Sequence, residues 1–129
     1  MRQVAAFPYR VASGFVEVLL VTSSSNRWII PKGDVDGGMA PHLAAEKEAF
    51  EEGGVRGRIG KQSIGSFATC KEQDGALIPL NVEVFPLEVD EELDGWPEME
   101  TRKRRWLRLN QAAGVVEDQG LAAIIDSFR

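Results

Sequence analysis

Three glutamates share one arc of a predicted helix, for which Pro41 suits the first turn and Gly53-Gly54 marks the end. Because successive helical residues turn by about 100°, the side chains of Glu51, Glu48 and Glu52 point to about 80°, 140° and 180° relative to Leu43. Neighbours at this spacing lie about 5–6 Å apart, and two charges about 6 Å apart repel by about 2.8 kcal/mol at an effective dielectric of about 20. A hard divalent cation turns that repulsion into attraction. The pattern therefore indicates metal-binding and catalytic glutamates, and a solvated acidic helix face is the alternative.

The same glutamates belong to a longer pattern that begins at Gly33. Residues 33–55 read GDVDGGMAPHLAAEKEAFEEGGV, which resembles the Nudix box, Gly-x5-Glu-x7-Arg-Glu-hydrophobic-x-Glu-Glu-x-Gly-hydrophobic. The matching residues, aligned without a gap, are Gly33, Glu48, Ala49, Glu51, Glu52, Gly54 and Val55. Outside the box, RWIIPKG before it, GSF at 65–67, NVEVFPLEV at 81–89 and RKRRW at 102–106 look like one branch of that family, which contains diphosphoinositol polyphosphate and dinucleoside polyphosphate hydrolases.

The resemblance implies an enzyme that hydrolyses a diphosphate linkage with Mg²⁺ or Mn²⁺. Such an ion neutralises the anionic diphosphate and lowers the pKa of the attacking water. The resemblance further implies that Glu48 and Glu52 are the foremost ligands, with a backbone carbonyl beside Gly33 as another. The general base stays open among Glu52, Glu48 and a glutamate on a distant loop. Glu98 and Glu100 are the loop candidates, and solvation is the alternative for both.

Basic residues outside this helix are candidates for binding the phosphates of the substrate. We assign this role to Arg27, Lys32 and Arg104, with Gly33 leaving room for phosphate to approach the backbone. Arginine binds phosphate oxygens as a bidentate fork and lysine binds them as a point charge. Because side chains alternate along a strand, at most half of the basic run at 102–105 can face one pocket. The expected partner is a small, highly anionic compound, either a dinucleoside polyphosphate or a diphosphoinositol polyphosphate.

Hydroxyl and aromatic side chains are further candidates for contact with such a substrate. Ser23, Ser24 and Ser25 can donate hydroxyl hydrogens to phosphate oxygens. Trp28 and Trp96 can stack on a base, although tryptophan more often packs in a core or at its edge.

Two positions depart from the Nudix pattern. Met39 stands where the first glutamate of the box is expected, and Lys47 stands where its arginine is expected. Lys47 keeps the positive charge one helical turn before Glu51 but lacks the planar fork of arginine. We expect both changes to tune the metal requirement rather than to abolish activity. They leave open a second function, in which a protein of this fold senses a phosphorylated ligand without cleaving it.

Composition indicates a single globular domain spanning residues 1–129. Hydrophobic residues make up 43% of the chain and charged residues 27%, as in ordinary soluble proteins. The net charge of −5 disfavours binding to a nucleic acid polymer, and no apolar run approaches the roughly 18 residues of a membrane span. The single cysteine, Cys70, excludes an internal disulfide and fits a reducing cytoplasm, where we expect the protein. The oligomeric state is left open.

Strand patterns occupy most of the remaining chain. The predicted strands span residues 3–10, 14–22, 28–30, 57–70, 76–89 and 103–109. The two long central strands are joined by a polar turn near 73–75, which predicts a hairpin. The spacing of Leu121, Ile124, Ile125 and Phe128 predicts an amphipathic C-terminal helix. Strands with one helix among them and one at the end indicate an α/β fold with a mixed sheet between helices. The Nudix resemblance implies the same α/β/α sandwich.

Overall fold

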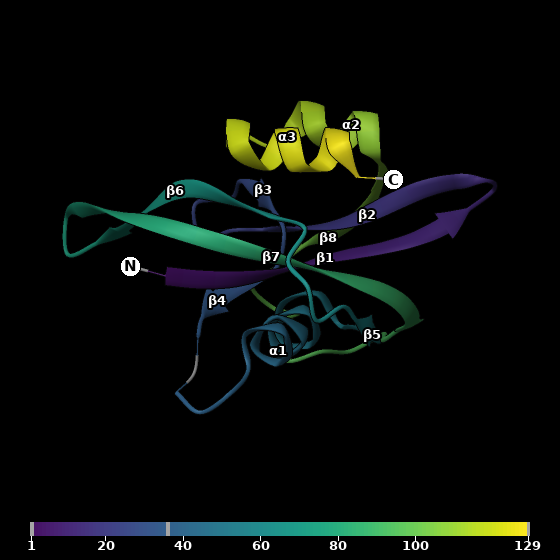
Figure 1. Cartoon of the computed structure of the whole chain (residues 1–129), viewed down its shortest axis with the longest axis horizontal. Helices are drawn as coiled ribbons and strands as arrows, with labels where there is room; N and C mark the ends of the chain where they lie inside the picture. Colours follow the sequence, from purple (N-terminus) through teal and green to yellow (C-terminus); the bar gives the residue numbers. More distant parts are fainter. Residues whose placement is uncertain (1, 36, 129) are drawn as a thin grey trace.

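A mixed β-sheet lies between two helical layers in the computed structural model, which describes residues 2–35 and 37–128 (Figure 1). The strands in that part of the chain are β1 (Arg2–Ala12), β2 (Phe15–Thr22), β3 (Trp28–Ile29), β4 (Lys32–Asp34), β5 (Val55–Ile59), β6 (Gly65–Gln73), β7 (Ala76–Glu92) and β8 (Arg104–Arg108). The helices are α1 (Pro41–Gly53), α2 (Leu109–Val115) and α3 (Gln119–Ser127). The predicted α/β fold with a mixed sheet between helices is confirmed.

The central strand of the sheet is β1. It pairs in parallel with β7, from Arg2 opposite Asn81 to Tyr9 opposite Glu88. Along its other edge it pairs antiparallel with β2 and with β4. Strands β5 and β6 both pair with β7, β3 and β8 both pair with β2, and all of these pairs are antiparallel.

The two faces of the sheet bury separate hydrophobic clusters because side chains alternate along each strand. On β1, Val4 and Ala6 pack in the cluster beneath α1, whereas Ala5 and Phe7 pack in the cluster beneath α2 and α3. The buried face of α1 carries small residues, including Ala45 and Ala49. Small side chains allow the helix to lie close to the sheet, and this closeness brings its glutamates to the strands.

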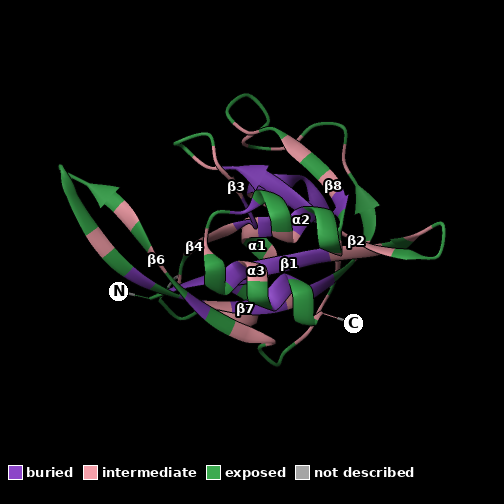
Figure 2. Cartoon of the chain, turned by 90° about the horizontal axis from the view of Figure 1, so that it is seen from above, coloured by how far each residue is buried: buried purple, intermediate pink, exposed green. Residues whose placement is uncertain are grey.

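Two tight hairpins join β1 to β2 and β6 to β7, and the second forms at the turn predicted near 73–75. Ser13 and Gly14 have φ values of 53° and 82°, and Asp74 and Gly75 have values of 53° and 79°. Positive φ at both central residues is the geometry that matches the twist of the flanking strands. The β6–β7 hairpin projects from the body of the protein, and much of it is exposed (Figure 2). No helix in the described ranges is long and apolar enough to cross a membrane.

The segment predicted as one strand at 57–70 is instead two strands, β5 and β6, which pair with successive parts of β7. The break lies opposite Pro86, which has no N–H to donate to a neighbouring strand. There the chain leaves the ladder, and it is held by the Gly60 N–H donating to the Pro86 carbonyl at 2.7 Å and the Ile64 N–H donating to the Val84 carbonyl at 2.8 Å.

Two short elements do not appear among the sequence predictions. Strand β4 continues the chain directly after Pro31 and pairs with β1, which places Gly33 opposite Val4. Helix α2 follows β8 immediately and buries Ala112. A helix of two turns is unstable in isolation, so α2 depends on its packing against β2, β8 and α3.

Candidate functional site

Glu52 is buried at the end of α1, with a side chain that is only 5% exposed. Its carboxylate Oε1 accepts a hydrogen bond from the Lys32 N–H at 3.1 Å, and its Oε2 lies 3.4 Å from Nη2 of Arg102. Its backbone carbonyl accepts a hydrogen bond from Nε1 of Trp96 at 3.0 Å. Burial raises the pKa of the Glu52 carboxyl to about 8, although Arg102 and the Lys32 N–H act in the opposite direction.

Glu48 lies one helical turn earlier, and its carboxyl group interacts directly with that of Glu52. Burial and the neighbouring charge of Glu51 raise the pKa of Glu48. Its carboxylate lies over the backbone of Gly33, so that a Cβ added at Gly33 would stand 2.5 Å from Cδ of Glu48. Glycine at position 33 is therefore required for the carboxylate to occupy this place.

Glu51 lies at the more exposed edge of the site, next to Glu48 and Glu52. It forms an ion pair at 4.0 Å with Lys47, one turn earlier on α1, and both side chains are more than a third exposed. Among residues 2–35 and 37–128, no three His, Cys, Asp or Glu side chains form a ready-made metal cage. Magnesium is commonly held by one or two carboxylates together with water and substrate phosphates. Glu48, Glu52 and the open backbone at Gly33 fit that mode of binding, with Glu51 at the edge.

Arg102 joins the carboxylates of α1 to the loop that follows β7. Its Nε donates to Oε1 of Glu98 at 2.7 Å, and its Nη1 donates to the Thr22 carbonyl at 2.8 Å. Of the two loop glutamates considered as a base, Glu98 is thus placed beside Glu52, whereas Glu100 is exposed. The sequence pattern placed Arg102 only within the basic run at 102–105. Alternation groups Arg102 with Arg104, both of which are less exposed than Lys103 and Arg105, but it does not distinguish Arg102 from Arg104.

A groove of about 990 Å³ opens beside this site. It lies between the loop at 23–27, the β6–β7 hairpin and the start of α3. Arg27, Lys32 and the three predicted serines all line it. Lys32 connects the groove to the carboxylates, because its side chain lines the groove while its N–H donates to Glu52. Nζ of Lys32 donates to Oε1 of Gln3 at 2.8 Å, and burial lowers its pKa against the opposing influence of Glu52.

Arg104, also predicted to bind substrate, lies apart from this groove. Its guanidinium donates to the carbonyls of Gly53 and Leu93 at 3.0 and 2.6 Å and stacks over Trp96 at 3.9 Å. This arrangement ties the loop after β7 to the end of α1 and favours a structural role for Arg104 and Trp96. Trp28 packs against the cluster beneath α2 and α3, as tryptophan commonly does.

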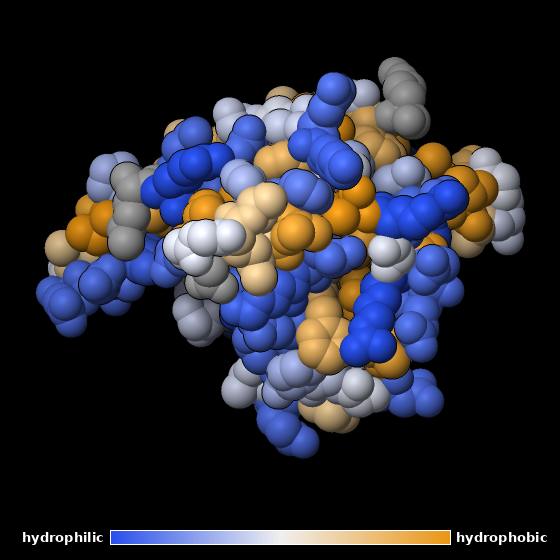
Figure 3. Space-filling view, turned by 60° about the horizontal axis from the view of Figure 1, so that its bottom comes forward, coloured by the Kyte–Doolittle hydropathy of each residue, from blue (hydrophilic) through white to orange (hydrophobic). Residues whose placement is uncertain are grey.

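The two departures from the box share a depression on the outer side of α1. Met39 and Lys47 line it together with Leu43 and Phe50, and its volume is about 550 Å³. Figure 3 turns the α1 side of the molecule toward the viewer and shows hydrophobic residues among strongly hydrophilic ones. Met39 therefore faces a depression that apolar side chains also line, whereas Glu52 is buried and Glu48 lies over Gly33.

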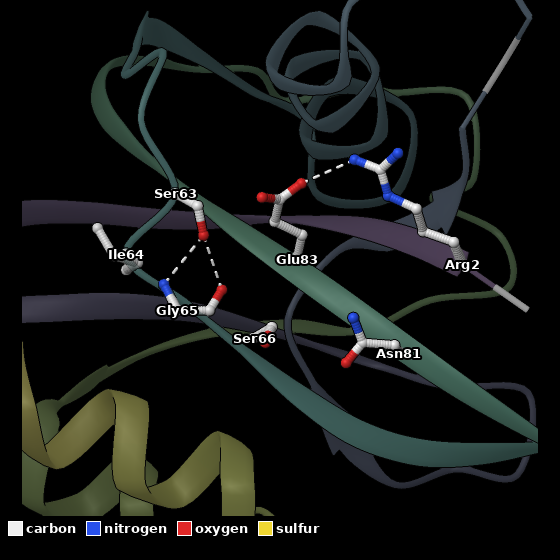
Figure 4. A pocket seen from close by; sticks show the side chains of 7 residues that line it. All are labelled: Arg2, Ser63, Ile64, Gly65, Ser66, Asn81 and Glu83. Atoms are coloured by element: carbon white, nitrogen blue, oxygen red, sulfur yellow. Dashed lines mark hydrogen bonds and ion pairs between the residues drawn. The ribbon is translucent and has the colours of Figure 1, made fainter.

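A third depression, of about 480 Å³, lies where β1 and β7 run side by side (Figure 4). Arg2 and Glu83 form an ion pair at 2.9 Å across it, and Ser63 bonds both to the N–H and to the carbonyl of Gly65. None of the predicted site residues lines it.

Proteins of known sequence resemble this chain over most of its length. Diphosphoinositol polyphosphate phosphohydrolase 3-beta of Bos taurus is 35% identical over 105 residues, which cover 78% of this chain and 60% of the relative. Nudix hydrolase 12, mitochondrial, of Arabidopsis thaliana is 30% identical over 118 residues, which cover 88% of this chain and 58% of the relative. The chain thus spans about three-fifths of the length of these relatives.

Solved structures share the fold at lower identity. An Ap4A hydrolase binary complex from C. elegans has a TM-score of 0.72 at 21% identity, covering 97% of this chain and 92% of that one. The E. coli dihydroneopterin triphosphate pyrophosphohydrolase has a TM-score of 0.73 at 15% identity, covering 98% and 93%. The family model described as the NUDIX domain matches residues 1–126. With that match spanning the sheet, α1 and its glutamates, the chain belongs to the NUDIX domain family.

Proposed function

We propose that this chain is a Mg²⁺- or Mn²⁺-dependent hydrolase of a diphosphate linkage in a small, highly anionic substrate, either a dinucleoside polyphosphate or a diphosphoinositol polyphosphate. The observation that carries the proposal is the pair of neighbouring carboxyl groups of Glu48 and Glu52, with Glu48 over Gly33, beside a groove that contains Arg27 and Lys32. The similarity to a protein named as a diphosphoinositol polyphosphate phosphohydrolase supports the reaction class.

Each residue of the site has a task in this reaction. Glu48 and Glu52 would hold a divalent metal ion, which when bound would neutralise the phosphates and lower the pKa of a water molecule. Lys32 and Arg27 bind phosphate oxygens in the groove. Glu98 lies within the same network through Arg102 and can accept the proton of the attacking water, as can Glu48 or Glu52.

A substrate panel with purified protein and magnesium tests this proposal. Both substrates are offered to the wild type and to the Glu52→Gln and Glu48→Gln variants, and released phosphate or nucleotide is measured. Each substitution keeps the shape of the side chain and removes a charge that binds metal, so most of the activity should be lost while the circular dichroism spectrum is retained. Glu46→Gln, on the outer side of the same helix, is the control and should stay active. Wild-type turnover in both active-site variants would contradict the proposal.

The alternative function is a sensor that binds a phosphorylated ligand without cleaving it. It is favoured by the departures from the Nudix pattern at Met39 and Lys47. A wild type that hydrolyses nothing in the panel, yet binds one of its members tightly in calorimetry, would support the sensor over the enzyme.

A further inference from the structure

The groove beside the carboxylates is not uniformly basic. Its cationic side chains are Arg27, Lys32 and Lys71, and its walls also carry Glu72 and Asp118. Three positive charges against two negative ones leave a formal surplus of only one. A site for an inositol ring that carries phosphate around its whole circumference needs positive charge on every side, because each phosphate adds charge that must be compensated.

Of these two acidic residues, Asp118 says more about which ligand the groove can bind. It stands directly before α3, yet its carboxylate makes no capping bond to that helix. Both of its oxygens instead accept from the Thr69 hydroxyl, at 3.0 and 3.2 Å. One hydroxyl occupies only part of the acceptor capacity of a carboxylate. Asp118 is thus held in place in the groove wall with acceptor sites remaining, and a carboxylate repels phosphate but accepts hydrogen bonds from neutral O–H and N–H groups.

Part of the groove wall is apolar. Ile29, Leu77, Pro79 and Leu80 line it, and Leu77 is 71% exposed. Apolar side chains at the wall of a ligand groove favour a flat, weakly polar group such as a nucleobase, and pockets that bind such ligands combine apolar walls with a few placed polar groups. A fully phosphorylated ring offers no such surface.

We propose that this groove binds a nucleoside end of the substrate, with Asp118 accepting hydrogen bonds from its ribose hydroxyls or base amino group, so that the enzyme prefers dinucleoside polyphosphates to diphosphoinositol polyphosphates. This inference rests on the proposed function and selects between its two substrates. In this arrangement Arg27 and Lys32 bind the phosphate chain, and Lys32 lies where that chain passes toward Glu52.

The experiment compares the wild type with Asp118→Asn on diadenosine tetraphosphate and on a diphosphoinositol pentakisphosphate, with magnesium. Asparagine keeps the shape and can still accept from Thr69, but it loses the charge. We expect kcat/KM for the dinucleotide to fall by about 10- to 100-fold, as for loss of a hydrogen bond to a charged group, and that for the inositol substrate to stay level or rise. Asp126→Asn, at an exposed position of the same helix, is the matched control and should change neither value.

A binding measurement without metal separates this inference from the proposed function. Calorimetry with a methylene-bridged diadenosine tetraphosphate should show about the same loss of affinity in Asp118→Asn. If that loss occurs but no substrate is cleaved, the groove assignment stands and the hydrolase proposal fails. The inference would be overturned if the wild type preferred the inositol substrate or if the protein bound no dinucleotide. It would also be overturned if Asp118→Asn affected both substrates equally or affected neither. The diinosine and bis-deoxyadenosine analogues distinguish the amino group from the ribose hydroxyl as the donor.

Discussion

Glu52 has an environment that would be unfavourable for a carboxylate without a positively charged ligand. It is buried next to Glu48, a second carboxylate, and the cation of Arg102 does not fully offset the burial, since the pKa is raised to about 8. A divalent cation would compensate both charges at once. The sequence predicted the crowding of glutamates from helical spacing alone. It could not predict that Glu52 would be buried and Glu51 left at the rim, because that depends on how α1 is rotated against the sheet.

Gly33→Ala tests the close contact between α1 and β4. The added methyl group would fall 2.5–2.7 Å from the three atoms of the Glu48 carboxylate group, which is the mobile end of a side chain. We therefore expect the carboxylate to move and the fold to persist, with a loss of about 10- to 100-fold in activity or metal affinity, as is typical when the support of a metal ligand is disturbed. The measurement is rate against magnesium concentration. Gly37→Ala, in the loop between β4 and α1, has open space around it and is the control. Equal behaviour of the two variants would show that the Glu48 position is unimportant.

Arg102→Met tests whether Arg102 positions Glu52 and Glu98. The variant removes the charge that lowers the pKa of Glu52 and the hydrogen bond to Glu98. We expect the ascending limb of the pH–rate profile to move to higher pH and the rate at neutral pH to fall by about 10- to 100-fold. Arg102→Lys should restore part of the shift in the profile, because it returns the charge without the fork. Arg105→Met, an exposed neighbour on β8, is the control. A lower melting temperature with an unchanged pH profile would mean that Arg102 only stabilises the fold.

At the scale of elements, the sequence signals that succeeded were local. The period of the α1 pattern, Pro41 in its first turn and Gly54 after its end all match the helix observed, and Asp74-Gly75 marks a tight turn. The failures involve partners distant in sequence. The segment predicted as one strand at 57–70 breaks opposite Pro86, because it pairs with β7, which contains that proline. The loop after β7 packs on α1, where Nε1 of Trp96 donates to the Glu52 carbonyl. No local pattern carries that information.

The two departures from the Nudix pattern lie on α1 and in the loop directly before it, with Lys47 on the helix and Met39 two residues ahead of Pro41. Their joint reversal tests this element as a whole. Met39 and Lys47 line one depression, so Met39→Glu with Lys47→Arg would place a carboxylate near a guanidinium beside the Glu51 end of the site. A more rigid support of the metal face should lower the magnesium concentration for half-maximal rate, by about 10-fold or more on the scale of supporting residues. Magnesium titration of the rate in both proteins measures this. An unchanged titration would show that the outer side of α1 does not reach the metal site.

At the scale of the whole molecule, the sheet assembles a site from parts that are far apart in the chain. Strand β4 supplies Gly33 and Lys32, α1 supplies the glutamates, and the loop before β8 supplies Arg102. The parallel pairing of β1 with β7 brings the β6–β7 hairpin beside β4 and so forms the groove. This juxtaposition explains why the residue types of the site could be predicted from sequence, while the groove wall containing Asp118 could not.

The final prediction concerns the stability of the whole protein as a function of pH. In the metal-free protein the pKa of Glu52 is raised from its ordinary value to about 8, and that of Glu48 is raised as well. The unfolded chain therefore loses these protons at lower pH than the folded chain does. The stabilisation is complete below the ordinary glutamate pKa and is lost as the pH rises toward about 8. The loss should be on the order of a few kcal/mol, or roughly 10 °C in melting temperature for a domain of this size.

Magnesium should reverse that trend, because it binds the deprotonated carboxylates and stabilises the folded state by about 2.7 kcal/mol at a concentration of about 100 times its Kd. Thermal melts between pH 5 and pH 8, with and without magnesium, measure both effects. The lowered pKa of Lys32 acts on stability with the opposite sign, so a Lys32→Met variant is melted over the same range. Glu52→Gln should flatten the metal-free curve and reduce the magnesium effect, whereas Glu46→Gln should preserve both. A metal-free stability that rises steadily from pH 5 to pH 8 would show that the buried pair does not hold protons in the folded protein.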